Sequence, residues 1–374
     1  MVMWKLFLGL ISILYFASSL SADQEVVDPA DITPILLPMW RNEIIAPGAV
    51  SQSALALDSA RVPHILYHNT AAQDLYWAYA DGDGWQRERV ATVSPEGLDV
   101  AIALDAQDRP YVAYVDGAAD KLVLGTRQGN KWSLEPIAAG GEQLSLAVGS
   151  DGIPQLILVR DKRLYYLRLQ GEEWLSELVG QGKYGLWNAR LVLDSEDRAH
   201  VAFTTNLESI YALRQGTNDW LSESLSFFLV EDLVIGPGDK VNILYSDLRY
   251  EGDGKYPTEY YELYLAERFN NGWYEELVFE LVSSFDNARL AFGPDGMMHA
   301  VVRDGGICSY LYFGWGTFER PVESCPSTGD ASLVVMENGE PLLLTHNDGD
   351  LILSVREIVR LDKHSLMPLV AGNG

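Results

Sequence analysis

The chain has 374 residues, of which 48% are hydrophobic and 11% aromatic, so it can bury a core and is not globally disordered. Its 27 lysines and arginines against 53 aspartates and glutamates give a formal charge of −26. No basic stripe is present to neutralise phosphates, which excludes nucleic acid as an expected partner and argues against binding to an anionic membrane surface.

The first 22 residues have the order of a signal peptide. Lys5 precedes the apolar run 6–16, and small residues follow up to a cleavage site after Ser21 or Ala22. This order predicts residues 1–22 as a signal peptide and an exported protein, secreted or periplasmic. The alternative is an uncleaved membrane anchor. Residues 23–39 contain three prolines and several acids, which predicts a linker.

Residues 40–360 contain a unit that recurs seven times. The expected first strand of each unit ends at Asp58, Asp105, Gly149, Asp194, Gly236, Gly293 and Met336. These positions are separated by 47, 44, 45, 42, 57 and 43 residues, and each unit holds four short β-rich runs divided by turn residues. Four strands in such a period are typical of a propeller blade. The sequence therefore predicts an all-β, seven-bladed β-propeller with four antiparallel strands per blade.

The seventh unit lacks the tryptophan with which the fourth strand of most units begins. The segment from Trp40 to Ala46 is similar to the fourth strand from Trp85 to Ala91. We therefore expect the N-terminal strand to complete the last blade and close the ring, which removes a free sheet edge. The alternative is that residues 366–370 fill this place. Residues 361–374 are otherwise expected to be a C-terminal tail.

The two cysteines are placed to form a disulfide in blade six. Cys308 begins the expected third strand and Cys325 ends the fourth, and their midpoint falls on the hairpin turn at Gly316 and Thr317. Antiparallel pairing puts the two residues opposite each other, within disulfide distance. An exported protein meets an oxidising compartment, so we predict a disulfide, with two free thiols as the alternative.

The turns before the fourth strands carry a Gly-x-x-Trp pattern, as in 82–85, 129–132 and 171–174. They resemble the Asp-box turns, or BNR repeats, of sialidase-like propellers. The repeats are degenerate, because Ala80, Arg127 and Leu169 stand where that pattern has its aspartate. The resemblance implies a propeller with loops gathered on one face. Its catalytic arginine triad has at most two counterparts here.

A ligand site is expected on the top face, where the first strands begin. Asn188-Ala-Arg190 and Asn287-Ala-Arg289 are the same tripeptide two blades apart. Two guanidiniums at the mouth of an acidic channel suit a carboxylate or sulfate. The alternative is that each arginine pairs with a nearby acid and orders the channel. The further candidates are acids that begin first strands or end second strands: Asp99, Asp116, Asp247 and Asp304.

Blade five has the longest period, with its excess at 247–261 between the second and third strands. Tyr250 and Tyr256 offer stacking faces beside carboxylates, a combination that suits sugar recognition. The alternative is an extended hairpin with solvated acids. The same oxygens make a calcium site the only cofactor considered, and otherwise no cofactor or metal is expected.

The sequence contains no catalytic residue set, because a nucleophile elbow, a phosphate-binding loop, a dinucleotide fingerprint and a zinc spacing are all missing from it. This favours a non-catalytic propeller that binds a glycan or protein ligand on its top face. The alternative is a glycoside hydrolase or polysaccharide lyase that uses the top-face arginines and acids. An enzyme should concentrate carboxyls of perturbed pKa in one deep pocket, whereas a binding module should have shallow repeated sites or one loop-built patch.

Overall fold

A computed structural model describes residues 35–361, with gaps at 49, 83, 207, 226–228, 252–257, 270–271, 282–284, 305–306, 315–321, 326–330 and 348. The regular elements in these ranges are the strands β1 to β28. One compact unit comprises Trp40–Arg356, and a second contains the described residues 35–39 and 357–361. None of the residues described belongs to a helix that could cross a bilayer. The expected signal peptide lies outside the described residues.

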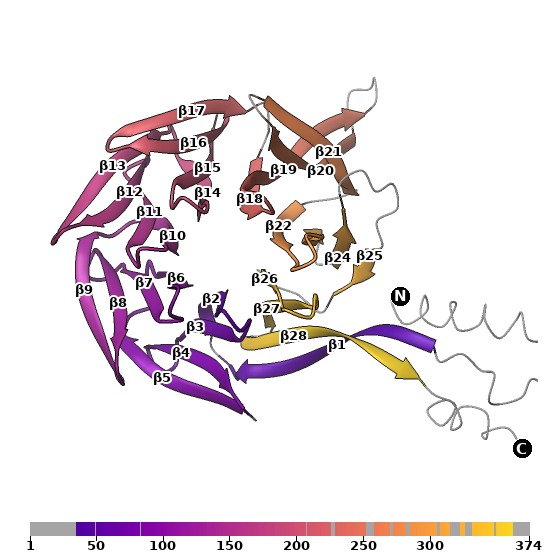
Figure 1. Cartoon of the computed structure of the whole chain (residues 1–374), viewed down its shortest axis with the longest axis horizontal. Coiled ribbons are helices and arrows are strands. Elements are labelled where there is room, and N and C mark those ends of the chain that lie inside the picture. The colour runs from indigo at the N-terminus through magenta and orange to yellow at the C-terminus, as the bar shows by residue number, and fades with distance from the viewer. Residues whose placement is uncertain are drawn as a thin grey trace, which may run out of the picture. The chain divides into compact units, whose positions relative to one another are not determined.

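The strands form seven four-stranded antiparallel sheets, which Figure 1 shows as blades around a common centre. The innermost strands of blades one to seven are β2 (Val50–Leu57), β6 (Asp99–Leu104), β10 (Glu142–Val148), β14 (Leu186–Leu193), β18 (Leu229–Gly236), β22 (Phe285–Phe292) and β26 (Ala331–Val335). The second strands are β3 (Pro63–Asn69), β7 (Pro110–Asp116), β11 (Pro154–Arg160), β15 (Ala199–Thr205), β19 (Lys240–Glu251), β23 (Met298–Asp304) and β27 (Pro341–Asn347).

The third strands are β4 (Asp74–Asp81), β8 (Lys121–Gln128), β12 (Arg163–Gln170), β16 (Ser209–Gly216), β20 (Thr258–Phe269), β24 (Ile307–Phe313) and β28 (Asp350–Leu361). The fourth strands are β5 (Gly84–Thr92), β9 (Lys131–Ala139), β13 (Glu173–Gln181), β17 (Asp219–Leu225), β21 (Gly272–Leu281), β25 (Val322–Ser324) and, in the seventh sheet, β1 (Ile35–Ala46). The predicted seven-bladed propeller is confirmed.

The turns that follow the innermost strands are closed by the residue that ends each strand. The Asp105 carboxylate accepts the backbone N–H groups of Gln107 and Arg109, both at 2.9 Å, and the Arg109 guanidinium at 2.6 Å. Asp194 closes the equivalent turn two blades on, accepting the backbone N–H of Arg198 at 2.9 Å. An aspartate that bonds to its own turn in this way fixes the chain reversal, so the recurrence of acids here is structural.

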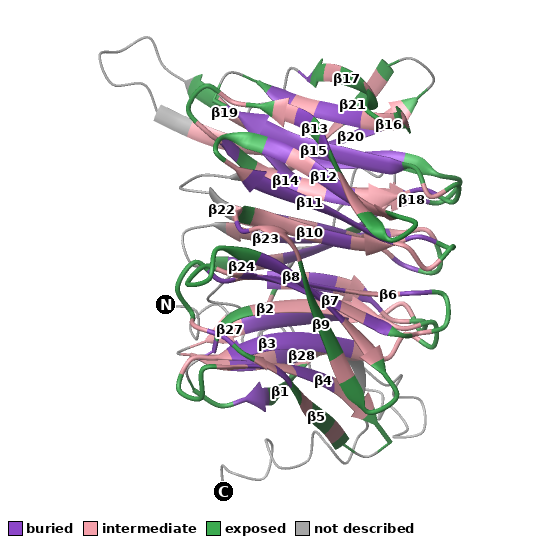
Figure 2. Cartoon of the chain, turned by 90° about the vertical axis from the view of Figure 1, so that its left-hand side faces the viewer, coloured by how far each residue is buried: buried purple, intermediate pink, exposed green. Residues whose placement is uncertain are grey.

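The apolar core lies between blades rather than at the centre of the ring. One cluster joins Leu164 and Tyr166 of β12 to Val201 and Phe203 of β15, across the interface of blades three and four. Figure 2 shows the same distribution, with buried residues inside the stacked sheets and exposed residues at their turns. Each blade therefore buries the faces of its sheet against the two neighbouring blades, as expected for a repeat unit that cannot bury both faces alone.

The histidines that recur in the second strands belong to this core. His200 Nδ1 and the Tyr211 hydroxyl are hydrogen-bonded at 2.6 Å, and the same pair recurs as His299 and Tyr310 at 2.6 Å. All four side chains are buried. Burial lowers the pKa of His299 to about 4, so this imidazole is neutral at physiological pH. These histidines are therefore core residues that recur at the same position of the repeat, and a catalytic role is not needed to explain them.

The sheet of blade seven has the strand order β1-β28-β27-β26. Ile45 of β1 is fully buried in a cluster with Leu351 and Leu353 of β28. Trp40 packs edge-on against Tyr310 of blade six, with ring centroids 5.5 Å apart. Strand β1 begins at Ile35, five residues before the expected start. That this strand closes the ring stays a prediction, and the alternative strand at 366–370 lies outside the described residues.

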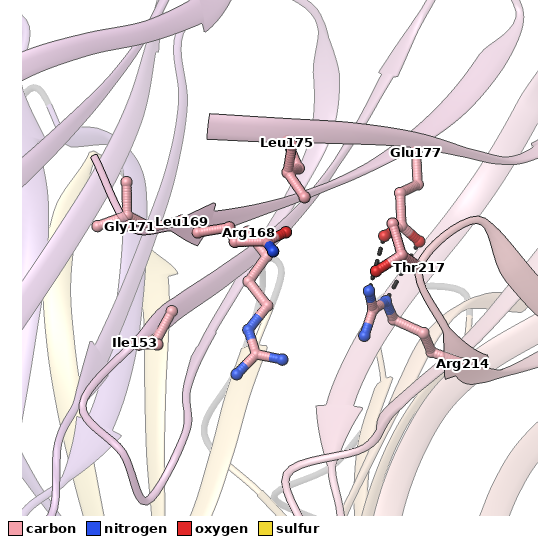
Figure 3. Close-up of a pocket in the computed structure, with 9 residues that line it drawn as sticks. Ile153, Arg168, Leu169, Gly171, Leu175, Glu177, Arg214 and Thr217 are labelled. Atoms are coloured by element: carbon pink, nitrogen blue, oxygen red, sulfur yellow. Dashed lines mark hydrogen bonds and ion pairs between the residues drawn. The ribbon is translucent and has the colours of Figure 1, made fainter. Parts of the chain in front are cut away.

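A second signature, Trp-x-x-Glu, opens six fourth strands, at Trp40, Trp85, Trp132, Trp174, Trp220 and Trp273. In four of these strands the glutamate accepts hydrogen bonds from the next blade. Glu177 accepts the Arg214 guanidinium at 2.7 and 3.2 Å (Figure 3). It also accepts the Trp220 indole N–H at 2.9 Å. Glu223 repeats the whole arrangement, accepting Arg268 and Trp273. Glu43 and Glu88 repeat one half each, accepting Trp85 and Arg127. We call this set the inter-blade clasps.

The predicted disulfide is confirmed. Cys308 of β24 is bonded to Cys325, with the two Cα atoms 5.1 Å apart. The Cys325 N–H also donates to the Cys308 carbonyl at 3.1 Å. The bond ties the last residue of the blade-six hairpin to its first, where strand β25 spans only Val322–Ser324.

Candidate functional site

Five of the seven innermost strands begin with a register shift, at the face that we call the top. The shifts lie between Val50 and Gln52, Glu142 and Ser145, Trp187 and Arg190, Val230 and Asp232, and Phe285 and Asn287. Each adds one residue relative to the partner strand, which leaves that residue unpaired and re-aims the side chains beside it. The mouth of the channel is thus built from repeated β-bulges.

The two predicted arginines follow two of these bulges and adopt the same conformation. Arg190 donates to the Ala189 carbonyl at 3.1 Å, and Arg289 donates to the Ala288 carbonyl at 2.8 Å. Burial, and then the charge of Arg289, lower the pKa of Arg190 to about 10, so it remains a cation at neutral pH. Arg190 lies 3.6 Å from the Asp232 carboxylate and Arg289 lies 3.5 Å from the Glu231 carbonyl, so both guanidiniums contact the start of strand β18.

The acids around the arginines also join neighbouring blades. Asp232 accepts Leu233 N–H at 3.0 Å and Leu290 N–H of blade six at 2.9 Å, while its carboxylate lies 3.6 Å from Arg190 Nε. For Arg190 the alternative that the sequence left open, pairing with a nearby acid, is therefore present. For Arg289, the acceptors in the described part of the chain are the Ala288 and Glu231 carbonyls, at 2.8 and 3.5 Å.

Asp99 of blade two makes the same pattern of hydrogen bonds as Asp232 of blade five, although it does not stand at the same position of the repeat. It accepts Val100 N–H at 2.9 Å and Leu144 N–H of blade three at 2.8 Å. Burial raises the pKa of Asp99, and the two N–H groups and Arg190 oppose this rise. The Asp99 carboxylate therefore accepts backbone N–H groups of blades two and three and is also stabilised by the positive charge of Arg190.

Glu231 is the extra residue of the bulge in β18, and no site prediction included it. Only 2% of it is exposed, and Oε1 accepts the Ser246 hydroxyl at 2.8 Å. Burial raises the pKa of Glu231 to about 8, against the attraction of Arg289 and Arg190. At neutral pH this carboxyl is mostly protonated, so it contributes little negative charge beside the two arginines.

A polar cavity of about 370 Å³ opens beside Arg289, between blades one, two, six and seven. We call it the axial pocket. Its wall is formed by Ser51, Gln52, Ser53, Asp99, Val100, Arg289, Ala331, Ser332 and His346. Ser53 Oγ and His346 Nε2 are hydrogen-bonded at 2.8 Å across the boundary of blades one and seven. The pocket therefore joins two predicted residues, Asp99 and Arg289, to a serine–histidine pair that was not predicted.

A sequence signal for His346 exists. The second strands of blades one and seven both end in His-Asn, as His68-Asn69 and His346-Asn347, and no other second strand does. His68 Nδ1 is 2.9 Å from Ser51 Oγ, just as His346 contacts Ser53. Because blades one and seven are neighbours in the ring, these pairs mark one sector of the mouth.

Other predicted residues serve the fold. Asp116 accepts Ala119 N–H at 3.0 Å and caps its hairpin turn. Asp247 accepts Leu248 N–H at 2.9 Å within its own strand. Asn188, with φ at +51°, donates its side-chain amide to the Val230 carbonyl at 2.7 Å and fixes the bulge before Arg190. Asn287 lies beside the equivalent bulge in β22.

The blade-five excess forms an extended hairpin, the alternative that the sequence left open. Strands β19 and β20 pair from Asn242 with Glu267 out to Glu251 with Thr258. Arg249 crosses the hairpin to Glu262 at 2.5 Å. Tyr250 stands near the tip and is 60% exposed. Tyr256 and the side chain of Asp304 lie outside the described residues.

Metal ligands do not cluster in the part of the chain that the structure describes: no group of three or more His, Cys, Asp or Glu side chains there could hold an ion. The tip of the hairpin at 252–257, where part of the calcium prediction falls, lies outside that part. A further cavity of about 310 Å³ between blades three and four is lined by Arg168, Glu177 and Arg214 (Figure 3), and its charged groups are engaged in ion pairs.

Comparisons with known proteins identify the fold and nothing narrower. No family model matches the chain, and no curated protein matches it, so the likeness to Asp-box repeats rests on the residues alone. Among solved structures, a virginiamycin B lyase from Staphylococcus aureus, in a catalytically inactive form with quinupristin, is 11% identical. The match covers 86% of this chain and 100% of that one, with a TM-score of 0.60.

Two further structures have the same arrangement of blades. An ulvan lyase, from a new family of polysaccharide lyases and bound to GlcA(1-4)Rha3S, is 11% identical, with coverage of 88% and 99% and a TM-score of 0.58. YCF48 bound to D1 peptide is 12% identical, with coverage of 88% and 96% and a TM-score of 0.55. Identities this low show a shared propeller fold and leave function to the site itself.

The raised pKa of Glu231 predicts a dependence of stability on pH. As pH rises from 4.5, the usual value for glutamate, to about 8, the unfolded state loses this proton before the folded state does. The free energy of unfolding therefore falls across that window. Glu231→Gln keeps an acceptor for Ser246 and carries no charge. As pH is raised from 5 to 9, we expect the free energy of unfolding of Glu231→Gln to increase relative to that of the wild type by on the order of 2 kcal/mol.

Urea unfolding at pH 5, 7 and 9 measures this gain. Glu208→Gln is the control, since Glu208 lies near the surface and the Ser224 hydroxyl donates to it. A difference between Glu231→Gln and wild type that stays constant from pH 5 to pH 9 would contradict the assignment.

Proposed function

We propose that the chain is an exported, non-catalytic binding propeller that recognises a glycan or protein ligand at its top face, with the axial pocket as its centre. The observation that carries the proposal is the pair of partly buried guanidiniums, Arg190 and Arg289, at the mouth of a chain with a formal charge of −26. Guanidiniums at the mouth of the channel can bind a carboxylate or sulfate group of a ligand through charged hydrogen bonds.

The dimensions and chemistry of the axial pocket suit one ligand unit. About 370 Å³ is at the small end of ligand pockets, enough for a single sugar or a single side chain. Arg289 offers paired donors for a carboxylate or sulfate. Gln52, Ser332 and His346 supply polar groups for hydroxyls or amides. The recognised solved structures include both lyases and a peptide-bound propeller, so the fold is compatible with either class of role.

An enzyme is the second candidate, and one observation favours it. The carboxyls with raised pKa in the described residues, Asp99 and Glu231, both interact with the charge of Arg190. Perturbed acids gathered at one site are what an enzyme needs. Both are tied up, however: Asp99 by two backbone N–H groups and Glu231 by burial. The enzyme would be a glycoside hydrolase or a polysaccharide lyase.

Replacing Arg289 by alanine tests the pocket. On an array of glycans and peptides, we expect the tightest ligand to bind at least tenfold more weakly to Arg289→Ala, because one charged hydrogen-bonding group is lost. Arg163→Ala removes the same charge from an exposed site in blade three and is the matched control. An equal loss of affinity in both variants, or no loss in either, would contradict ligand binding in the axial pocket.

Turnover of the same ligand separates the two candidates. Binding without release of product supports the binding module, whereas product formation that disappears in Arg289→Ala supports the enzyme. Binding that survives loss of both arginines and is abolished by Tyr250→Ala would move the site to the blade-five hairpin. Export is tested separately: the intact mass of the mature protein should correspond to a chain that begins at Ala22 or Asp23.

A further inference from the structure

Trp187 is an exposed aromatic residue at the rim of the channel, and the repeat does not account for it. Its position stands seven residues before the end of the innermost strand. In the other blades, the residues that pair with the corresponding position of the second strand are Gln52, Asp99, Glu142, Leu229 and Asn287 in blades one, two, three, five and six. None of these is aromatic, so the fold does not need a large ring there. The side chain is nevertheless 42% exposed, which leaves much of the ring in contact with water.

The bulge in β14 puts Trp187 and Arg190 on one face of the sheet. Trp187 is paired with Thr204, and Arg190 with Ala202. Side chains of directly paired residues lie on the same side of an antiparallel sheet, and Thr204 and Ala202 are two residues apart on β15. Without the extra residue, positions three apart would point to opposite sides. The bulge therefore aligns the exposed indole with the channel guanidinium.

The loop before β14 holds the indole in place. A Cβ atom at Gly182 would lie 1.9 Å from the Gly185 carbonyl oxygen, so only glycine permits this close turn. A Cβ atom at Gly185 would approach the Trp187 ring to 3.1 Å, so the ring edge rests against this backbone. The Gly182 N–H donates to the Lys162 carbonyl at 3.0 Å, which anchors the loop to blade three. The ring is thus presented by a fixed loop.

We propose that Trp187 and Arg190 form a subsite for an acidic sugar unit, with the sugar ring stacked on the indole and its carboxylate or sulfate directed to the guanidinium. The proposal rests on the proposed function and narrows its ligand to a glycan. The C–H face of a pyranose packs on an aromatic ring, and the indole N–H remains available to donate to a hydroxyl. Spacing along the strand fits one sugar, since two paired positions span roughly 7 Å.

The charge of the chain limits the kind of acidic glycan. A formal charge of −26 repels dense polyanions, whereas a single acidic unit in an otherwise neutral oligosaccharide meets mainly the local field of Arg190 and Arg289. The expected occupant is therefore an oligosaccharide with isolated uronate or sulfate groups, not a heavily sulfated polymer.

An array of oligosaccharides tests this subsite. It should carry units with one uronate, units with one sulfate, and the neutral counterpart of each. We expect binding confined to acidic members, and the two acidic sets tell which anion is preferred. For the best member, titration calorimetry should give about tenfold weaker binding to Trp187→Ala and no more than a threefold change for Trp187→Phe, which keeps a stacking face.

Phe269→Ala is the matched control, because Phe269 is an exposed aromatic residue (59%) far from the proposed subsite. It is the last residue of a third strand, at the end of the strands away from the top face. This variant should bind as the wild type does. Equal binding of acidic and neutral members, no binding of any glycan, or unchanged binding by Trp187→Ala would overturn the subsite. If a peptide binds and Arg289→Ala abolishes it while Trp187→Ala does not, the proposed function survives and this inference fails.

Discussion

Replacing Ile45 by alanine should lower the free energy of unfolding by about 2–5 kcal/mol, the usual cost of emptying a fully buried aliphatic site. Ile45 has no exposed surface and packs with Leu351 and Leu353 of β28, in a cluster that continues into blade one. The loss would measure how much strand β1 contributes to the last blade. Urea unfolding followed by tryptophan fluorescence gives the value.

The neighbouring residue provides the control. Ile44 is 55% exposed on the other side of the same strand, so Ile44→Ala should change the free energy of unfolding by less than about 0.5 kcal/mol. Two similar losses would mean that β1 does not pack as described. Deletion of residues 23–48 extends the test: it should abolish cooperative unfolding if β1 closes the ring, because β28 would become a free edge. A small loss would favour closure by residues 366–370.

The sequence was sufficient for the fold because each blade repeats the same physical requirement. A turn acid such as Asp105 and a fourth-strand tryptophan such as Trp220 recur with the period of a blade, and the structure uses each of them locally. Cys308 and Cys325 were paired for the same reason, since hairpin geometry depends on few residues. Arg190 and Arg289 were found because their tripeptides are identical in register.

Features that depend on a one-residue irregularity were not found. Glu231 reaches the arginine cluster because a bulge inserts it into β18, and counting residues from the strand end cannot locate a bulge. The sequence left open whether the blade-five segment is a ligand-binding excursion or an extended hairpin, and backbone pairing extends the strands into it. The axial pocket needs Ser53 and His346, which lie 293 residues apart and meet only when the ring is formed.

Replacing Glu177 by alanine should cost about 3–5 kcal/mol, the typical result of removing one partner from a buried ion pair. Its carboxylate is 2% exposed and is the acceptor for both Arg214 and Trp220 of the next blade. The hydrogen bond to Glu177 raises the pKa of Arg214. Even without this contribution the guanidinium stays charged at neutral pH, because the ordinary pKa of arginine lies far above 7. An unpaired cation would then remain in the interface of blades three and four (Figure 3).

Glu135 is the matched control for this clasp, because it is the glutamate of the same Trp-x-x-Glu signature in blade two but is exposed. Blade three has Leu169 opposite Trp174, where blade four has Arg214 opposite Trp220, so no arginine reaches Glu135 from the equivalent place. Glu135→Ala should therefore be within about 0.5 kcal/mol of the wild type. Urea unfolding of both variants compares a Trp-x-x-Glu glutamate that bonds to the next blade, Glu177, with one that is exposed, Glu135.

A double-mutant cycle separates the clasp from the packing around it. If Glu177 and Arg214 stabilise the interface as a pair, Glu177→Ala/Arg214→Ala should cost less than the sum of the single changes by about 1–3 kcal/mol. Additive losses would assign the effect of Glu177 to Trp220 alone. Since the same arrangement recurs at Glu88 and Glu223, a large coupling at Glu177 would mean that charge pairs, as well as apolar cores, fix the order of the blades. The axial pocket would then depend on these distant contacts, because its wall is assembled from four blades.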